Sequence, residues 1–272
     1  MALRLHSALA RAWLVGGTAI VLLFLYLPIA ILVLFSFNSG GRLSFPMQGF
    51  SLRWYDQVLS DPVFTTAIEN SLIVGTVAAA TTAVLGTLAA FGLSLASPRL
   101  RGVMGLLFFA PITLPGLFLG LSMLTFFAEA HVRLSLWTVA AAHFVYTFPY
   151  FLMIGRAALE RMDPGFDEIA ADLGAAPRQR FFKVTLPLVW PVLAAAAVLA
   201  FALSFDEFII TFFVIGPQST TPLVIWSGMR RAADPSINAL ATLLLLVTLV
   251  GTIAMVALVS VRRQTRKAVL TP

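Results

Sequence analysis

The chain has 272 residues, of which 60% are hydrophobic and only 11% are charged. Soluble proteins average about 25% charged residues, so this composition predicts a protein that sits in lipid. The absence of cysteine excludes disulfides, thiolate metal sites and a cysteine nucleophile. The net charge of +6 could serve nucleic-acid binding, but the basic residues form short clusters between apolar runs. Such clusters orient membrane helices, so we expect a lipid environment and no nucleic-acid partner.

Six apolar segments are long enough to cross a membrane, because about 20 apolar residues span ~30 Å of hydrocarbon as a helix. They cover roughly residues 14–35, 71–95, 103–127, 136–154, 188–215 and 240–261. The first segment is longer than the apolar part of a secretory signal and lacks a small-residue cleavage site, so we expect it to be retained as a span. The sequence therefore predicts an all-α, multi-pass membrane protein with a single domain over residues 1–272.

Basic residues gather on one side of this expected membrane topology. The side with both termini and the loops 97–102 and 156–183 holds thirteen: Arg4, Arg11, Arg99, Arg101, Arg156, Arg161, Arg178, Arg180, Lys183, Arg262, Arg263, Arg266 and Lys267. The other side holds five: Arg42, Arg53, Arg133, Arg230 and Arg231. Because cytoplasmic loops carry the excess of Lys and Arg, we expect both termini and the loop 156–183 in the cytoplasm.

The loop 156–183 contains the pattern of a short amphipathic helix. Asp163 is suited to cap its start, with Pro164 at the first helical position, and Gly174 is suited to end it. Negative charge suits the first turn of a helix, where two acids lie: Asp167 and Glu168. The apolar residues share one face at helical spacing: Phe166, Ile169, Ala170 and Leu173. A helix this short cannot span a membrane, so its apolar face must cover either a partner or the chain's own helices.

The same loop carries the most specific motif of the sequence. It reads Glu168-Ile169-Ala170, followed by Gly174, Phe181 and Val184-Thr185-Leu186-Pro187. This pattern resembles the "EAA" loop of permease subunits in bacterial ABC importers, although Ile169 stands where the family usually has alanine. In that family the loop forms a coupling helix that docks on the ATP-binding subunit. The resemblance therefore implies an ATPase-docking surface made of Phe166, Asp167, Glu168, Ile169, Ala170, Leu173 and Gly174.

Shorter motifs extend the resemblance over most of the chain, and they are most similar to the second permease subunit of spermidine/putrescine importers. They are Asn70-Ser71-Leu72, Gly86–Phe91, Asp172–Ala175, Asp206-Glu207-Phe208, Phe213–Pro217 and Asn238–Thr242. The resemblance implies a bacterial inner-membrane permease that forms half of a path for a small cationic amine, with polyamines first. It also implies a second, different permease subunit, two copies of an ATP-binding subunit and an extracytoplasmic substrate-binding protein. Related importers leave γ-aminobutyrate, another amino-acid-like compound, thiamine or ferric ion as alternative solutes.

The sequence also indicates that the energy source lies on another chain. It contains no G-x-x-x-x-G-K-[ST] phosphate loop, and its only lysines are Lys183 and Lys267. We therefore expect no cofactor here and Mg-ATP on the partner ATPase. Neither a nucleophile with a base nor a metal-binding motif is evident, so we expect no enzymatic activity and no metal site. An ion-coupled secondary transporter is a further alternative, although we detect no inverted repeat.

Two adjacent acids lie within the fifth predicted span, where ionisable residues are costly and mark functional candidates. On a helix Asp206 and Glu207 point about 100° apart. Glu207 shares a stripe of small polar residues with Ser204 and Thr211, which favours Glu207 on the substrate path. Asp206 would then pair with a neighbouring helix or a basic residue. The alternative is that both acids only reach the aqueous interface at the end of a tilted span.

The fourth predicted span offers a second stripe, made of His143, Tyr146, Thr147 and Tyr150, with Pro149 as a possible kink. Aromatic faces bind cations with about 0.5–2 kcal/mol each, so this stripe could help to enclose an ammonium group. Aromatic packing between helices is the alternative interpretation.

The third predicted span contains four residues that predict a bend or an unwound stretch: Pro111, Thr113, Pro115 and Gly116. Polyamine permeases often carry an acidic residue directly after the equivalent of Pro115. Because Gly116 stands there, one cation contact implied by the resemblance is missing.

Overall fold

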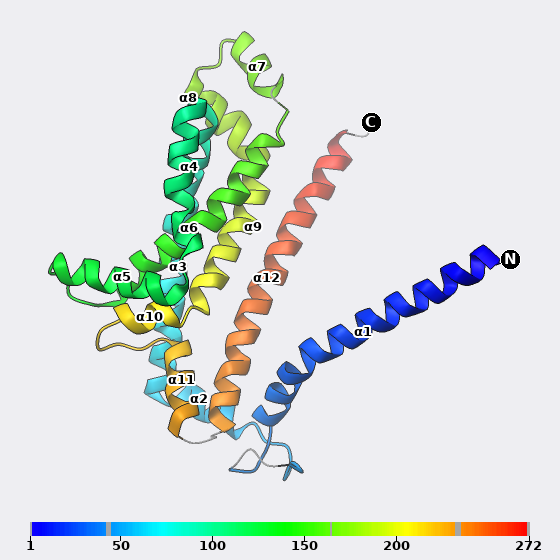
Figure 1. Cartoon of the computed structure of the whole chain (residues 1–272), viewed down its shortest axis with the longest axis vertical. Helices are drawn as coiled ribbons and strands as arrows, with labels where there is room; N and C mark the ends of the chain where they lie inside the picture. The colour runs from blue at the N-terminus through cyan, green and yellow to red at the C-terminus, as the bar shows by residue number, and fades with distance from the viewer. Residues whose placement is uncertain (1, 42–44, 164, 232–234, 271–272) are drawn as a thin grey trace. The chain divides into compact units, whose positions relative to one another are not determined.

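The computed structural model describes residues 2–41, 45–163, 165–231 and 235–270, with side chains except at 2–10, 12, 231, 255–256 and 258–270. Some residues used above therefore lie outside the described residues or side chains: Arg4, Arg42, Pro164, Arg231, Arg262, Arg263, Arg266 and Lys267. The described chain is built of helices, with one isolated β-bridge between Asn38 and Phe50 (Figure 1). The predicted all-α class is confirmed.

Five stretches of the described residues are long and apolar enough to cross a membrane. They lie in α1 (Ala2–Ser36), α3 (Pro62–Leu95), α6 (Leu136–Glu160), the stretch that ends with α9 (Leu186–Phe205), and α12 (Pro235–Leu270). A bent pair of helices makes a sixth if it counts as one span. The prediction of about six spans is confirmed, although several helices extend beyond the predicted ranges.

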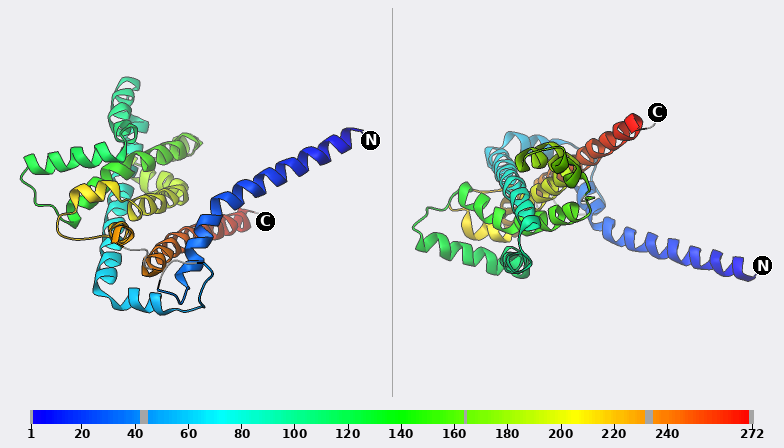
Figure 2. Two further views of the ribbon diagram at one scale, coloured as in Figure 1. Left: turned by 60° about the horizontal axis from the view of Figure 1, so that its bottom comes forward. Right: turned by 90° about the horizontal axis from the view of Figure 1, so that it is seen from above.

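The third predicted span is broken in the middle. The direction of the chain changes by 107° between α4 (Pro98–Thr113) and α5 (Gly116–Glu129) (Figure 2). Leu114 is extended, as expected for a residue that precedes a proline, and it ends α4. The predicted bend is confirmed, and it divides the segment 103–127 between two helices.

The fifth predicted span ends earlier than expected. α9 ends at Phe205, and the short α10 (Ile209–Val214) begins after a break at residues 206–208. A continuous helix over residues 188–215 is therefore wrong, and both acids lie in the break. The physical reason is that the Glu207 carboxylate accepts hydrogen bonds from backbone N–H groups in the first turn of α10, so a new helix begins there.

The chain divides into two compact units, and the predicted single domain stays a prediction. The first unit holds residues 1–65 and 225–245 and includes α1 and α2 (Arg53–Ser60). α2 is held by Trp54, whose buried indole N–H donates to the Asn38 carbonyl at 2.6 Å. The unit also includes the end of α11 (Thr221–Arg231), from Ile225 onward, and the start of α12.

The second unit, residues 66–224 and 246–272, contains both candidate functional regions. α6 packs along α9, while α10 packs against α5 and α6. One apolar core joins these helices through Leu119, Val139, Ile210 and Val214. α5 can approach α10 closely because Gly120 has no side chain: a Cβ there would lie 3.1 Å from the Ile210 Cα. These contacts hold α10 next to the break between α4 and α5.

Candidate functional site

A short exposed helix, α7 (Gly165–Asp172), forms within the predicted coupling loop. α6 continues to Glu160, so the loop begins later than the expected Arg156. The Asp163 carboxylate accepts the Gly165 N–H at 3.0 Å, which satisfies one of the free donors at the helix start. The predicted cap by Asp163 is confirmed.

The end of α7 is also built as its sequence predicts. Gly174 has a φ of +80°, a conformation that costs glycine little and other residues more. The N–H of Gly174 bonds to the Ala171 carbonyl at 2.9 Å, and the N–H of Ala175 bonds to the Ala170 carbonyl at 3.0 Å. These two bonds complete a Schellman motif, so α7 has both of its ends defined by local sequence.

The apolar face of α7 is uncovered. Phe166, Ile169 and Leu173 are 50%, 60% and 83% exposed, and no residue of the helix is buried. Because the helix does not cover the chain's own bundle, the alternative of an internal cap is not what the fold shows. Exposed apolar side chains gathered on one helix face are typical of a protein-binding surface.

A packed route leads from α7 to α9. Asp167 forms a 2.9 Å ion pair with Arg180 at the end of α8 (Pro177–Arg180), while Glu168 is left exposed. The π-helix η1 (Phe181–Thr185) then continues directly into α9, and the Phe181 ring packs on Phe91 of α3 with centroids 4.6 Å apart. α8, η1 and α9 thus follow one another without a gap, from the partner of Asp167 to the two acids.

That far end is a turn over residues 206–208, which we call the acidic turn. The Glu207 side chain is only 10% exposed, and its Oε2 accepts the N–H of Ile210 at 2.8 Å and of Thr211 at 3.3 Å. Its Oε1 lies 3.8 Å from the point that a Cβ on Gly116 would occupy. The carboxylate therefore faces the break between α4 and α5, at the position where the resemblance led us to expect another acid.

A buried hydrogen-bond network supports the acidic turn. His143 Nδ1 lies 2.7 Å from Ser204 Oγ, and Nε2 lies 2.9 Å from Thr211 Oγ1. Thr211 donates its hydroxyl proton to the Glu207 carbonyl at 3.0 Å, so it must accept from Nε2–H. The Ser204 hydroxyl can either donate to Nδ1 or accept from it, and Nε2 also lies 3.9 Å from Glu207 Oε2. The structure brings these predicted residues together, but their burial gives them a positioning role around Glu207.

Two tyrosines of α6 complete the surroundings of the acids. The rings of Tyr146 and Tyr150 meet edge to face with centroids 5.7 Å apart. Tyr146 also interacts electrostatically with Glu207 and Asp206. Asp206 is exposed, and the partner expected for it is not found, because no ion pair among the described residues includes Asp206. Among the described residues no Lys or Arg forms an ion pair with either acid, and the nearest basic group printed for Glu207 is His143, whose Nε2 lies 3.9 Å from Oε2.

The sequence did not lead us to two residues that support this region, Thr82 and Gly120. Thr82 of α3 hydrogen-bonds to Thr147 at 2.8 Å, and Thr147 donates to the His143 carbonyl, which ties α3 to the network. Gly120 follows Gly116 at a spacing of four, the small-residue pattern that allows close helix packing in membranes, so this signal was available. Thr82 carries no such signal.

In the part of the chain that the structure describes, no three His, Asp or Glu side chains are placed to hold a metal ion.

Comparisons with known proteins identify the family of this chain. Residues 82–264 match the family model of the binding-protein-dependent transport system inner membrane component. The putrescine transport system permease protein PotI of Escherichia coli K12 is 39% identical over 241 residues, covering 85% of each chain. The spermidine/putrescine transport system permease protein PotC of the same strain is 33% identical over 243 residues, covering 88% of this chain and 90% of PotC.

Solved structures with low sequence identity share the fold. A chain of a bacterial ABC transporter that imports the polysaccharide alginate superposes with a TM-score of 0.76 at 16% identity, over 94% of this chain and 98% of that one. A chain of the MetNI methionine ABC transporter gives 0.66 at 18% identity, over 73% and 95%. The chain belongs to the family of inner membrane components of binding-protein-dependent transport systems, and it is a permease subunit of an ABC importer.

Proposed function

We propose that this permease forms half of a translocation path for a small cationic amine, with putrescine and spermidine as the first candidates. The single observation that carries the proposal is the acidic turn, where Glu207 and Asp206 lie beside Tyr146 and no Lys or Arg among the described residues forms an ion pair with either acid. The names of PotI and PotC support the same solute class.

The chemistry of the acidic turn suits passage rather than tight capture. The carboxylates of the acidic turn attract an ammonium group, and a tyrosine face adds about 0.5–2 kcal/mol. One oxygen of Glu207 is already held by backbone N–H groups, so the other, which faces Gly116, is free to meet the solute. A conducting site must attract the solute and still release it, and a few moderate contacts meet both needs.

The driving force comes from outside this chain. Two copies of an ATP-binding subunit would bind Mg-ATP, and one would dock on the apolar face of α7. A second permease subunit, different from this one, would complete the path, and an extracytoplasmic binding protein would deliver the solute. The movement of α7 would reach the acidic turn through η1 and α9, which are continuous in the chain. The excess of thirteen basic residues over five supports a cytoplasmic position for α7 and for both termini.

A zwitterion with a single ammonium group, such as γ-aminobutyrate, is the second candidate. It is favoured by Gly116, because the break between α4 and α5 offers no second carboxylate opposite Glu207.

Uptake in vesicles that contain the whole importer tests the proposal. We expect putrescine or spermidine to be taken up and to stimulate ATP hydrolysis, while γ-aminobutyrate is taken up weakly. Stimulation by γ-aminobutyrate alone would contradict the polyamine assignment and establish the second candidate.

A further inference from the structure

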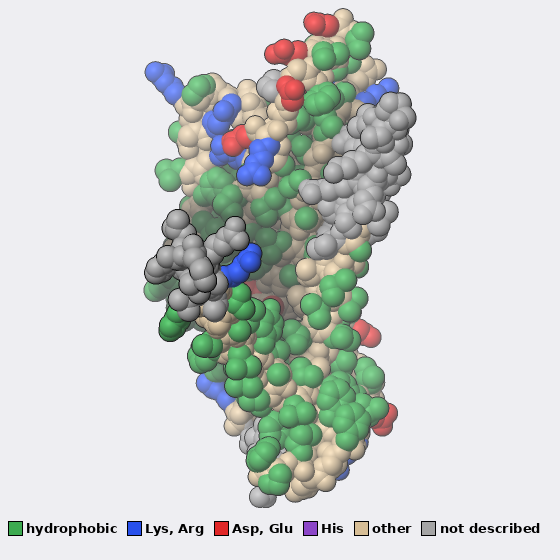
Figure 3. Space-filling model, turned by 90° about the vertical axis from the view of Figure 1, so that its right-hand side faces the viewer, with side chains coloured by type: hydrophobic (Ala, Val, Ile, Leu, Met, Phe, Trp, Pro, Cys, Tyr) green, Lys and Arg blue, Asp and Glu red, His purple; other side chains and the backbone are tan. Residues whose placement is uncertain are grey.

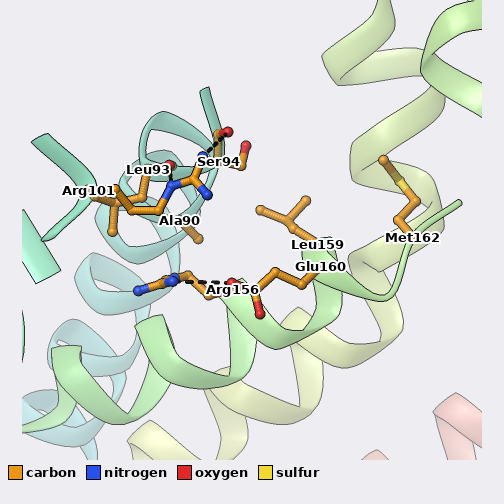
Figure 4. A pocket seen from close by; sticks show the side chains of 8 residues that line it. All are labelled: Ala90, Leu93, Ser94, Arg101, Arg156, Leu159, Glu160 and Met162. Carbon is orange, nitrogen blue, oxygen red and sulfur yellow. Dashed lines mark hydrogen bonds and ion pairs between the residues drawn. The ribbon is translucent and has the colours of Figure 1, made fainter. Parts of the chain in front are cut away.

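A pocket of about 240 Å³ opens between three helices of the second unit, far along α9 from the acidic turn. It lies where α3 ends, α4 begins and α6 ends (Figure 4). Arg101 and Arg156 line it together with Glu160, and apolar contacts come from Ala90, Leu93 and Leu159. Its volume is below the ~300–1,000 Å³ of typical drug-sized sites, so it suits a small head group rather than a whole large ligand.

Arg101 is fixed at the rim of this pocket by the end of α3. Its Nε donates to the Leu93 carbonyl at 3.0 Å, and its Nη2 donates to the carbonyls of Ser94 and Ala96 at 3.0 and 3.2 Å. These carbonyls are the ones that a helix end leaves without partners. Guanidinium has five N–H donors in a planar fork, so the Nη1 donors are still available to an anion.

Arg156 supplies the second positive charge. Its Nη2 donates to Glu160 at 3.1 Å, one turn later on α6, and its Nη1 lies 3.9 Å from the point that a Cβ on Gly105 would occupy. In Figure 4 the guanidinium groups of Arg101 and Arg156 lie on the same side of the pocket. Two guanidinium groups against one carboxylate leave a net positive charge, which disfavours the cationic solute and favours an anion.

The pocket lies at the level where the apolar spans end. The candidate spans in α3 and α6 end at Leu95 and Glu160, so the guanidinium groups sit at the head-group region rather than in the hydrocarbon. In Figure 3 charged side chains gather toward the end that carries α7. Leu93 and Leu159 add apolar surface to the pocket wall, and contact with the glycerol and upper acyl chain of a lipid would bury it from water.

We propose that this pocket binds the phosphate of an anionic phospholipid from the cytoplasmic leaflet. Basic pockets between membrane helices on the cytoplasmic side are suited to such head groups, because that leaflet carries the negative surface charge. The choice of leaflet rests on the orientation proposed above. A lipid bound there would bridge α3, α4 and α6 beside the loop that carries α7.

Binding of monomeric short-chain lipids to the purified whole importer, measured by native mass spectrometry without solute or ATP, tests this proposal separately from transport. The probe is dioctanoyl phosphatidylglycerol, with dioctanoyl phosphatidylcholine, glycerol 3-phosphate and inorganic phosphate for comparison. We expect phosphatidylglycerol to bind at least about fivefold more tightly than phosphatidylcholine, given about one charge contact of advantage. We expect a similar advantage over glycerol 3-phosphate and inorganic phosphate, because these anions have no acyl chains to bury. Equal binding of inorganic phosphate would show a free-anion site and overturn the lipid assignment.

Paired variants make the test specific to the pocket. Arg156→Gln should weaken binding of phosphatidylglycerol about fivefold, while Glu160→Gln should strengthen it, because the competing carboxylate is gone. Arg161→Gln and Arg99→Gln remove one exposed charge each outside the pocket lining and should leave binding unchanged. If Arg156→Gln and Arg161→Gln weaken binding equally, the effect is general surface charge and the proposal is wrong. If Arg156→Gln lowers ATPase association but not lipid binding, the pocket serves the protein partner instead.

Discussion

α7 and the acidic turn lie at opposite ends of the segment that runs through η1 and α9, and they are built in opposite ways. α7 has no buried residue, and both of its ends are held by bonds within residues 163–175. The acidic turn is held by bonds to His143, which is 61 residues before Ser204 and 68 before Thr211. α7 is thus a locally defined helix with an exposed apolar face, whereas the acidic turn depends on contacts with α6, which is distant in the sequence.

This difference separates the two kinds of defect that substitutions should cause. A change on the exposed face of α7 removes partner contacts without disturbing the chain's own packing, so coupling should fail while the chain still folds. A change in the acidic turn alters the charge that a solute meets, so solute preference should change while ATPase docking persists.

The largest effect is expected from polar substitutions on the face of α7. Leu173→Asp removes an apolar side chain whose burial in an interface is worth about 1.5–3 kcal/mol, so ATPase association should weaken about 10- to 100-fold. Because Leu173 is 83% exposed, the amount of folded permease in the membrane should stay unchanged. Co-purification of the ATP-binding subunit measures the loss, and Asp172→Asn on the same helix is the matched control. Normal association of the Leu173 variant would contradict the docking role of α7.

Loss of the Glu207 charge should come next. Glu207→Gln keeps an oxygen that can accept the Ile210 N–H, so the start of α10 is preserved while the negative charge is lost. We expect uptake of putrescine to fall about tenfold, given a charge contact of about 1–4 kcal/mol at partial burial, and Asp206→Asn to have a smaller effect because that side chain is exposed. The control is Glu129→Gln, which removes an exposed acid at the end of α5. Equal uptake by all three variants would show that the acids only reach the aqueous interface.

A second carboxylate opposite Glu207 should sharpen the selectivity of the turn. A Cβ on Gly116 meets Glu207 and Ile209 only at ordinary contact distances of 3.8 and 3.9 Å, so Gly116→Asp can be accommodated. We expect it to raise the preference for putrescine over γ-aminobutyrate several-fold, because a diamine can pair with two acids. Competition uptake measures the ratio. Gly116→Ala adds bulk without charge, and an identical ratio for the two variants would rule out an electrostatic role.

The smallest effect is expected from the ion pair that ties α7 to α8. Arg180 and Asp167 are 27% and 43% exposed, and exposed pairs contribute about 0–1 kcal/mol. Arg180→Gln should therefore lower solute-stimulated ATPase activity by no more than about fivefold, with Arg178→Gln as the control on the same helix. A loss as large as that of Leu173→Asp would mean that the pair, rather than the apolar face, transmits the coupling.

The sequence predicted α7 well because every feature that defines it is local. Asp163 and Gly174 lie within a residue or two of the helix that they cap, and the apolar face follows from spacing alone. Pro115 made the break between α4 and α5 predictable for the same reason. The family motifs then supplied the docking role that the pattern itself left open.

The break between α9 and α10 could not be predicted in this way. Residues 188–215 form an apolar run with good helical character, and the break appears only when Glu207 bonds to Ile210 and Thr211. The burial of His143, Ser204 and Thr211 likewise depends on α6 packing along α9, which no spacing within either helix reveals. The sequence therefore identified His143, Ser204 and Thr211 as candidates, but it did not reveal that they are buried and support Glu207 from within the fold.

The most direct test of the account is uptake of radiolabelled putrescine by vesicles that contain both permeases, the ATP-binding subunit and the binding protein. The account predicts uptake that requires ATP and is lost in the Leu173→Asp variant, whatever ion gradient is applied. Uptake driven by an ion gradient without ATP, and unchanged in that variant, would contradict it and identify the chain as a secondary transporter.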